Sequence, residues 1–289
     1  MQAAGLAVRR ARAERVRSEI ERLGALPAIV TKILRISDDP NAGIDDLARE
    51  VEQDPILAAR LFKLANSSYY ARATEVTTIE EAVRMLGFST IRNLTLAASA
   101  GKIVNLDFKG YRFPEFGLWQ HSVAVALAAQ PLAKLVGLPV EMEGELLLAG
   151  LLHDTGKLAL DGAIAEAGVD DARVSLEIEE AVVGHTHPAV GVWIADKWKL
   201  PAHAAAVIEQ HHEPDPDSEF AGHAAAIHLA DYLVNRHGIG VAEDTEWICP
   251  VSPAALHILN LKEDELDELE SSFKEQLEAI GAACDALLG

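Results

Sequence analysis

Cysteines and long apolar runs are scarce in this sequence of 289 residues, and each shortage excludes a class of protein. The two cysteines, Cys249 and Cys284, are too few for a disulfide framework and form no Cys-x-x-Cys pair, so we expect both to stay reduced. The longest apolar run, 146–152, is far shorter than the roughly 20 residues that a membrane-spanning helix needs. The N-terminus also lacks the apolar core of a secretory signal. We therefore expect a soluble, cytoplasmic protein.

Basic residues are scarce as well. The sequence has 25 Lys and Arg against 45 Asp and Glu, which gives a formal net charge of -20. A protein with this charge repels nucleic acid and anionic membranes alike, so we expect neither duplex nucleic acid nor a membrane as a partner. The other residues, with 49% of the chain hydrophobic, are typical of a globular protein and exclude a disordered one.

Histidine is absent from the first 110 residues, whereas all 11 histidines lie between His121 and His257. Charge is divided at the same place, because residues 1–110 carry 16 basic and 14 acidic residues while residues 111–289 carry 9 and 31. The two compositions predict an N-terminal helical part over 1–110 and a histidine-rich bundle over 111–237. A third segment, 238–289, is predicted to be irregular at first and then an acidic helix.

Helix signals are clear in the first part. Residues 8–23 predict an Arg/Glu-rich helix whose apolar stripe is thin, so it is either solvated or packed on a partner. Asp54 and Pro55 are typical of an N-cap and a first helical residue. The spacing of Thr78 and Glu81 predicts a capping box, and Gly87 is placed to end that helix.

The second part repeats apolar residues with helical spacing and has few alternating strings, so the fold class is predicted to be all-α. Apolar helices are expected over 116–137, 143–153, 188–198, 202–212 and 220–236.

The apolar run 146–152 leads directly into His153, Asp154 and Lys157, which places an imidazole, a carboxylate and an ammonium at the end of a buried helix. His153 and Asp154 can converge on one ion there, because the carboxylate can swing around it. Alternatively, Asp154 caps a following helix and His153 satisfies a buried carbonyl. The dipeptide alone does not decide between these interpretations.

Further polar residues interrupt the other apolar helices, and together they are rich in imidazole with two carboxylates. Such a set suits Fe, Mn or Zn better than Ca or Mg, and its size allows one or two ions. Two ions would activate water for attack on phosphorus, with Asp154 and Lys157 as candidate catalytic residues and Lys157 free to pair a phosphate oxygen. Singly, His211 or His212 could instead cap a helix that Pro214 closes. The candidate metal ligands are His121, His153, Asp154, His187, His211, His212 and Asp231.

These ligands follow in the order found in the HD superfamily of metal-dependent phosphohydrolases, and over about residues 20–235 the chain resembles the HDOD branch, the HD-related output domains. Other motifs carry the resemblance further along the chain. They are Leu26-Pro27, Gln53-Asp54-Pro55, Leu64 to Tyr70, Ile79 to Gly87, Trp119 to Ser122, Gly184 to His187, Trp198 to Pro201 and His211 to Pro214.

The resemblance implies an N-terminal helical bundle packed on an HD-type helical bundle, and a role in bacterial signal transduction. Many HDOD domains have lost HD ligands and act as regulatory modules, whereas this chain keeps them. Pro-Asp-Pro-Asp follows Glu213 here, in place of the Gly-Tyr-Pro of the similar HD-GYP phosphodiesterases, so cyclic di-GMP hydrolysis is not expected.

Two functions are therefore open. The first is a signalling module that acts on a signalling protein partner, with a retained metal site. Its contact surface would lie in the first part, around Arg60, Lys63, Tyr69, Tyr70 and Arg72. The alternative is a metal-dependent phosphohydrolase acting on a nucleotide or cyclic dinucleotide, which the shortage of basic residues in 111–289 disfavours.

Overall fold

All regular structure in the described part of the chain is helical, and no strand occurs there, which confirms the predicted all-α class. The computed structural model describes residues 2–24, 32, 35–36, 39, 42–53, 55–67, 70, 76–88, 91, 108–169, 174–240 and 250–288. Its α-helices are α1 (Gln2–Arg22), α3 (Ile44–Glu52), α4 (Pro55–Ala65), α5 (Ile79–Leu86), α7 (Gly117–Leu135), α8 (Glu143–Leu152), α9 (Lys157–Ala167), α10 (Leu176–Val182), α11 (His187–Trp198), α12 (Ala202–Gln210), α13 (Ala221–Arg236), α14 (Pro253–Ile258) and α15 (Leu266–Leu288), with short 3-10 helices η2 (Val140–Met142) and η3 (Glu263–Glu265).

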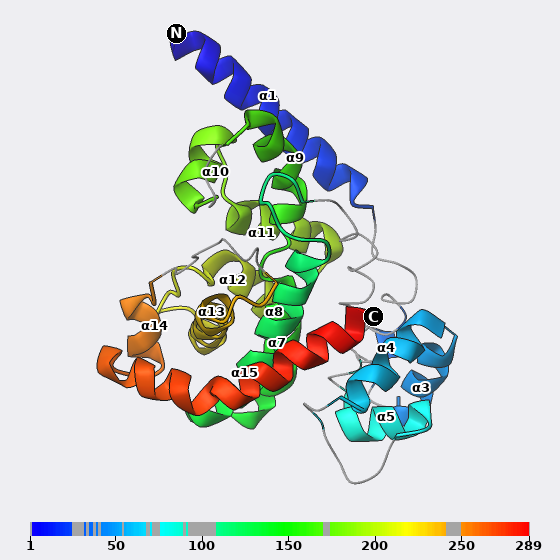
Figure 1. Ribbon diagram of the computed structural model, residues 1–289. Coiled ribbons are helices and arrows are strands. Elements are labelled where there is room, and N and C mark those ends of the chain that lie inside the picture. Colours follow the sequence, from blue (N-terminus) through cyan, green and yellow to red (C-terminus); the bar gives the residue numbers. More distant parts are fainter. Residues whose placement is uncertain are drawn as a thin grey trace.

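Helices α3, α4 and α5 pack on one another in a small bundle (Figure 1). The predicted capping box is present, since the Thr78 hydroxyl accepts from the Glu81 amide at 3.1 Å and Glu81 accepts from the Thr78 amide. Gly87 ends α5 with a positive φ of 81°. Helix α4 begins at Pro55 as expected, whereas its predicted N-cap Asp54 and the Leu26-Pro27 motif lie outside the described residues.

The larger bundle is built around α7 and α8, which are buried along most of their length. Helix α13 packs on α7, α12 packs on α8, and α11 packs on α12 and α9. Helices α7 and α8 approach closely at Gly150, where a Cβ atom would lie 2.6 Å from the Cα of Ala126. The apolar helices predicted in this part are confirmed to within two residues at each end.

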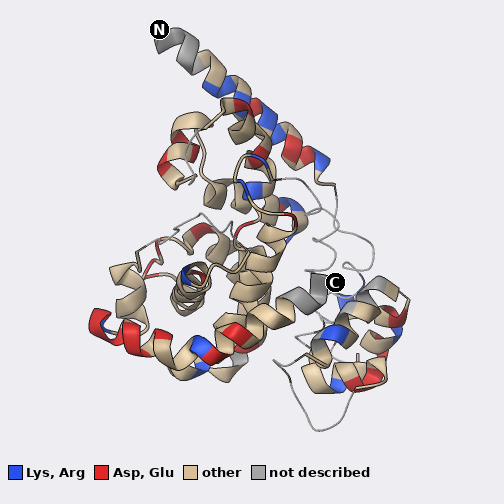
Figure 2. Cartoon of the chain, in the orientation of Figure 1, with Lys and Arg blue, Asp and Glu red and all other residues tan. Residues whose placement is uncertain are grey.

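Helix α1 packs against α9 and α10 of the larger bundle, although it begins the chain. Val16 and Ile20 are buried there, while Arg9 pairs with Glu180 at 2.5 Å and Arg15 pairs with Glu166. Figure 2 shows the alternating basic and acidic residues along this helix. Val16 and Ile20 of the thin apolar stripe thus pack within the chain, whereas Val8 is exposed.

Helix α15 crosses the larger bundle and reaches the small one, contacting both α7 and α4 (Figure 1). It buries Phe273, Leu277 and Ile280 on one face, and its charged residues line the other. The predicted boundaries at 110 and 237 stay a prediction, and α1 and α15 each pack across one of them.

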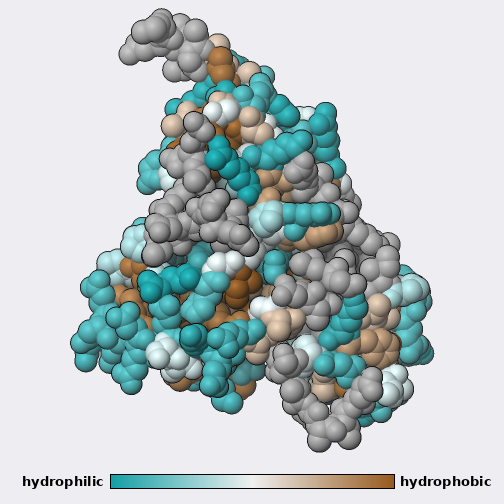
Figure 3. All heavy atoms as spheres, viewed as in Figure 1, coloured by the Kyte–Doolittle hydropathy of each residue, from teal (hydrophilic) through white to brown (hydrophobic). Residues whose placement is uncertain are grey.

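Few large hydrophobic residues are exposed in the described part of the chain. Val8, Leu135 and Val140 are the exposed large hydrophobic residues there, and Figure 3 shows hydrophilic residues over most of the described part of one face. Among the described residues, no helix combines the length and apolar character needed to cross a lipid bilayer. Cys284 is buried, and Cys249 lies outside the described residues, so the reduced state of both cysteines stays a prediction.

Candidate metal centre

Helix ends deliver most of the candidate ligands to one point inside the larger bundle. His153 follows the last residue of α8, Asp154 comes next, and His187 is the first residue of α11. His211 follows the last residue of α12, directly before His212. The remaining two, His121 and Asp231, project from within α7 and α13.

His121, His153 and Asp231 form a first triad, with one ligand atom of each within 4.8 Å of the others. Nε2 of His121 lies 2.9 Å from Oδ1 of Asp231, and Nε2 of His153 lies 4.0 Å from the same oxygen. Oδ2 of Asp154 lies 3.3 Å from Nε2 of His153 and 3.8 Å from Nε2 of His121. Two imidazoles and two carboxylates therefore surround this point.

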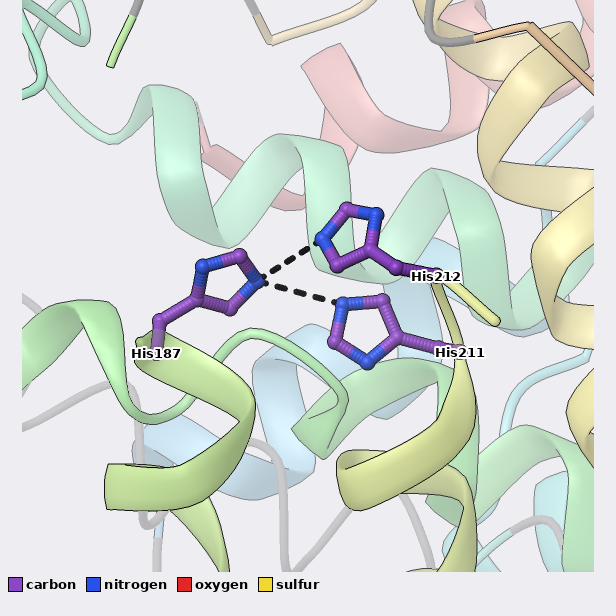
Figure 4. Close-up of side chains that lie close together, drawn as sticks. All are labelled: His187, His211 and His212. Atoms are coloured by element: carbon purple, nitrogen blue, oxygen red, sulfur yellow. Dashed lines mark hydrogen bonds between the residues drawn. The ribbon is translucent and has the colours of Figure 1, made fainter. Parts of the chain in front are cut away.

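His187, His211 and His212 form a second triad, drawn in Figure 4. Nε2 of His187 lies 3.2 Å from Nε2 of His211 and 3.0 Å from Nε2 of His212. The other oxygen of Asp154, Oδ1, lies 3.2 Å from Nε2 of His187 and 3.8 Å from Nε2 of His211. Asp154 thus stands between the triads and turns one oxygen toward each. With His153 and His211 it forms a further group whose ligand atoms lie within 4.8 Å of one another, so the two triads adjoin.

Hydrogen bonds at Nδ1 set the tautomers of three of these histidines. Nδ1 of His153 donates to the Gly150 carbonyl at 2.8 Å, and Nδ1 of His211 donates to the Ile208 carbonyl at 3.0 Å. Nδ1 of His187 donates to the Glu179 carboxylate at 2.8 Å. Since carbonyls and carboxylates only accept, these imidazoles carry hydrogen at Nδ1 and, when neutral, a lone pair at Nε2.

The donor set fits a metal ion. In the neutral state, the lone pairs of His187 and His211 would face each other at 3.2 Å, a contact that a shared cation makes favourable. Nε2 of His153 and Oδ1 of Asp154 are buried and have no hydrogen-bond partner. Buried polar atoms without partners are rare in folded proteins, and metal ions bound among these ligands would satisfy both atoms.

The pKa shifts of the imidazoles show where protons can occupy the centre instead. Burial lowers the pKa of His187, but the neighbouring carboxylates of Glu179 and Asp154 outweigh burial, so the pKa is raised above 6.5. The pKa of His153 is also raised, because Asp154 and Asp231 outweigh the effect of its burial. Burial and the neighbouring histidines hold the pKa of His211 well below 6.5, and burial together with His187 lowers that of His212 to about 3.

The two carboxylates of the centre are ionised. Burial would raise the pKa of Asp154, but Lys157 and His153 hold it well below 3.8. The pKa of Asp231 is likewise lowered, since the hydrogen bond and charge of His121 outweigh burial. The ammonium of Lys157 donates to Oδ2 of Asp154 at 2.6 Å and lies over the rings of Tyr111 and Phe113.

The structure brings all seven candidate ligands and Lys157 together. Nδ1 of His153 satisfies a buried carbonyl, as one interpretation expects, while its Nε2 faces Asp154, so His153 stays a candidate ligand. Asp154 does not cap α9, whose N-cap position is Gly156. His185 packs on the ring of Trp193 and lies outside both triads.

Glu179 and His228 lie next to the centre but are not among the candidate ligands. Glu179 is fully buried beneath His187, and His228 donates from Nδ1 to the His211 carbonyl at 2.7 Å while accepting the Ser252 amide at Nε2. Glu179 lies in the acidic run of α10, which looks like a solvated face. Ser175, the N-cap residue of α10, predicts where the helix begins, but it does not indicate which face of the helix is buried.

The HDOD domain family model matches residues 23–214, which is most of the chain. The chain belongs to the HDOD domain family. Asp231 lies beyond the matched part of the HDOD domain and reaches the centre through α13.

Three solved structures have a fold similar to that of this chain. An HDOD domain protein of unknown function from Geobacter sulfurreducens is 25% identical with a TM-score of 0.72, over 94% of this chain and 98% of that one. A candidate signal transduction protein from Marinobacter aquaeolei VT8 is 23% identical with a TM-score of 0.67, over 97% of this chain and 66% of that one. A candidate phosphohydrolase from Shewanella amazonensis SB2B is 22% identical with a TM-score of 0.65, over 93% and 98%.

An uncharacterized protein of Treponema pallidum (strain Nichols) is 23% identical over 227 residues, which are 76% of this chain. The match covers 43% of that relative, so the chain corresponds to less than half of its length.

Proposed function

We propose that this chain is a bacterial signalling or regulatory HDOD module that holds two transition-metal ions and acts through a protein partner. The contact between Nε2 of His187 and Nε2 of His211, 3.2 Å apart in a buried site, carries the metal-binding part of the proposal. Fe, Mn or Zn suits this mixture of imidazole and carboxylate ligands.

Each triad would hold one ion, and Asp154 would be shared. His121, His153, Asp231 and Oδ2 of Asp154 would hold the first ion. The second ion would lie among Oδ1 of Asp154 and the second triad. When bound, a pair of such ions supplies Lewis acidity for attack of water on a phosphoester and stabilises the leaving oxygen.

Burial and charge favour a regulatory role over turnover of a phosphate ester. Asp154 is 2% exposed, and the ammonium of Lys157 is hydrogen-bonded to it. Residues 111–289 contain only nine Lys and Arg, so an anionic substrate would find few cationic contacts on this part of the chain. A partner would instead sense the fold that the ions stabilise.

Of the proposed partner surface, Lys63 is exposed and Tyr70 half-buried, while Tyr69, Arg72 and the Arg60 side chain lie outside the described residues.

A metal-dependent phosphohydrolase acting on a nucleotide or cyclic dinucleotide is the second candidate function. The position of Asp154 favours it, because a carboxylate that turns one oxygen to each of two ligand sets suits a two-metal hydrolytic centre. In that case Asp154 and Lys157 are the proposed catalytic residues, with Lys157 leaving Asp154 to pair a phosphate oxygen.

Elemental analysis tests the metal site before any substrate is chosen. Untagged protein from cells grown with ample iron and manganese is expected to contain close to two ions per chain. The double variant His153→Ala/Asp154→Ala should lose them, whereas His185→Ala, which removes a histidine outside both triads, should keep them. Equal metal content in all three proteins would refute the site.

A phosphodiester screen on the metal-loaded protein separates the two functions. We expect no turnover of cyclic di-GMP, because the Gly-Tyr-Pro segment is absent. Metal-dependent hydrolysis of any nucleotide that the double variant abolishes would establish the phosphohydrolase and reject the purely regulatory role. A purified signalling protein that binds the loaded chain but not the double variant would support the regulatory role.

A further inference from the structure

Glu179 is a fully buried carboxylate that accepts hydrogen bonds from three donors. The Tyr111 hydroxyl donates to Oε1 at 2.7 Å, and the backbone amide of His187 donates to Oε2 at 2.6 Å. Nδ1 of His187 lies 2.8 Å from Oε1 and 3.0 Å from Oε2. Burying a charge without partners is unfavourable, and this number of donors offsets the loss of water.

The neighbouring glutamates of α10 make no such contacts. Glu177 and Glu180 are exposed, and Glu180 pairs at the surface with Arg9. Glu179 therefore differs from them in its surroundings rather than in its chemistry. Glu180 provides a matched control, since it lies on the same helix and carries the same charge.

The histidine that Glu179 holds is central to the second triad. Nε2 of His187 lies within 3.2 Å of an atom of His211, of His212 and of Asp154. A carboxylate at Nδ1 fixes the tautomer and ring orientation of a histidine and makes its Nε2 a stronger ligand. His153 and His211 are held instead by main-chain carbonyls of Gly150 and Ile208, which are weaker acceptors.

We propose that Glu179 is a positioning residue for His187 and thereby sets the affinity of the second triad for its ion, while the first triad is unaffected. This inference rests on the proposed function, because it requires that the centre binds metal. Within the described residues, the hydrogen bonds of the Glu179 side chain reach only His187 and Tyr111. None of them reaches His121, His153 or Asp231.

Tyr111 holds Glu179 from a segment that is itself anchored. Its backbone amide and that of Gly110 both donate to Oδ1 of Asp161, at 3.0 and 2.8 Å. Tyr111→Phe would remove one donor to Glu179 and leave the carboxylate in place. It is therefore the milder variant, and it should fold even if a change at Glu179 does not.

The test is a titration of metal-free protein with Co²⁺, followed by calorimetry and by the visible absorption of the bound ion. Wild type is expected to take up two equivalents. In Glu179→Gln, one equivalent should bind roughly 10- to 100-fold more weakly with an altered Co²⁺ spectrum, the range typical for loss of a residue that orients a ligand. Tyr111→Phe should weaken the same equivalent less, and Glu180→Gln should match wild type.

His121→Ala provides the converse measurement, because it should weaken the other equivalent. Equal weakening of both equivalents in Glu179→Gln would mean a general effect on the fold and would overturn the proposal. Unchanged uptake by a folded Glu179→Gln would overturn it as well. If Glu179→Gln does not fold, Co²⁺ uptake by Tyr111→Phe equal to that of wild type would overturn the proposal. If wild type binds no Co²⁺, the proposed function and this inference both fail. If wild type binds two equivalents and a folded Glu179→Gln binds them equally well, only this inference fails.

Discussion

Single atoms decide the chemistry of the centre. His153, His187 and His211 each donate from Nδ1, two to carbonyls and one to Glu179, so each directs Nε2 at the ligand cluster. This arrangement leaves a choice between protons and metal ions, because closely spaced nitrogen lone pairs need a cation between them.

Metal binding should release protons near neutral pH. The pKa values of His153 and His187 are raised above 6.5, so both imidazoles keep their protons to a higher pH than a free histidine does, and an ion must displace those protons. Affinity for Co²⁺ should therefore rise with pH through these pKa values and fall as pH drops. His212, with its pKa near 3, is already neutral and contributes no proton between pH 5 and 8.

Calorimetry in buffers of different ionisation enthalpy measures this release. The apparent binding enthalpy should change with the buffer at pH 7, and the dependence should shrink as pH is raised to 9. An enthalpy independent of the buffer at pH 7 would show that the two imidazoles are neutral before metal binds.

The ends of helices assemble the centre, and at Gly156 they pack too closely to accept a larger residue. At Gly156, before α9, a Cβ atom would lie 1.9 Å from the carbonyl oxygen of His187 and 2.8 Å from the amide nitrogen of Gly191. Both neighbours are backbone atoms of α11, so they cannot move aside without moving the helix that carries His187.

Gly156→Ala should therefore destabilise the protein and weaken the second triad. Overpacking of this kind lowers the free energy of unfolding by about 1–3 kcal/mol. Urea unfolding and Co²⁺ uptake measure the two effects. Gly281→Ala, within α15, is the control, since the atom nearest to the added Cβ is the side-chain Cδ1 of Ile239 at 3.9 Å. Wild-type stability and uptake in Gly156→Ala would contradict the packing at this helix end.

Helix α15 is held by a stripe of buried side chains, of which Phe273 is 1% exposed. Phe273→Ala should lower the free energy of unfolding by about 3–5 kcal/mol, since it removes a large buried side chain and leaves a cavity. Gln276→Ala, at an exposed position of the same helix, should change it by less than about 0.5 kcal/mol. Chemical denaturation compares the two, and similar values would mean that α15 is not anchored by this stripe.

Across the whole molecule, the centre links helices that are far apart in sequence. Helices α7 and α13 each supply a ligand from within, and the ends of α8, α11 and α12 supply the others. An ion that binds only the folded chain shifts the folding equilibrium by mass action.

Removal of metal should therefore lower the thermal stability of the entire bundle. At a free metal concentration about 1,000 times the Kd, each ion adds about 4 kcal/mol to the free energy of unfolding. Scanning calorimetry with and without a chelator should show a lower Tm in the chelated sample. The double variant His153→Ala/Asp154→Ala should show no difference, and a chelator effect of equal size in that variant would exclude the centre as its cause.

Local signals in the sequence predicted the helices and the ligand types. The Thr78 capping box, Gly87 and the apolar periodicity of α7 and α8 are properties of neighbouring residues, so they can be read without the fold. The ligand set followed from histidines and carboxylates that interrupt apolar helices, where a polar group needs a specific partner.

Tertiary structure alone decided how those ligands divide. The separation into two triads, the position of Asp154 between them and the burial of Glu179 beneath His187 depend on contacts between different helices. The packing of α1 on α9 and α10 likewise joins segments more than a hundred residues apart. A sequence pattern records which face of a helix is apolar, but the identity of the neighbour on that face is set by the packing of the whole chain.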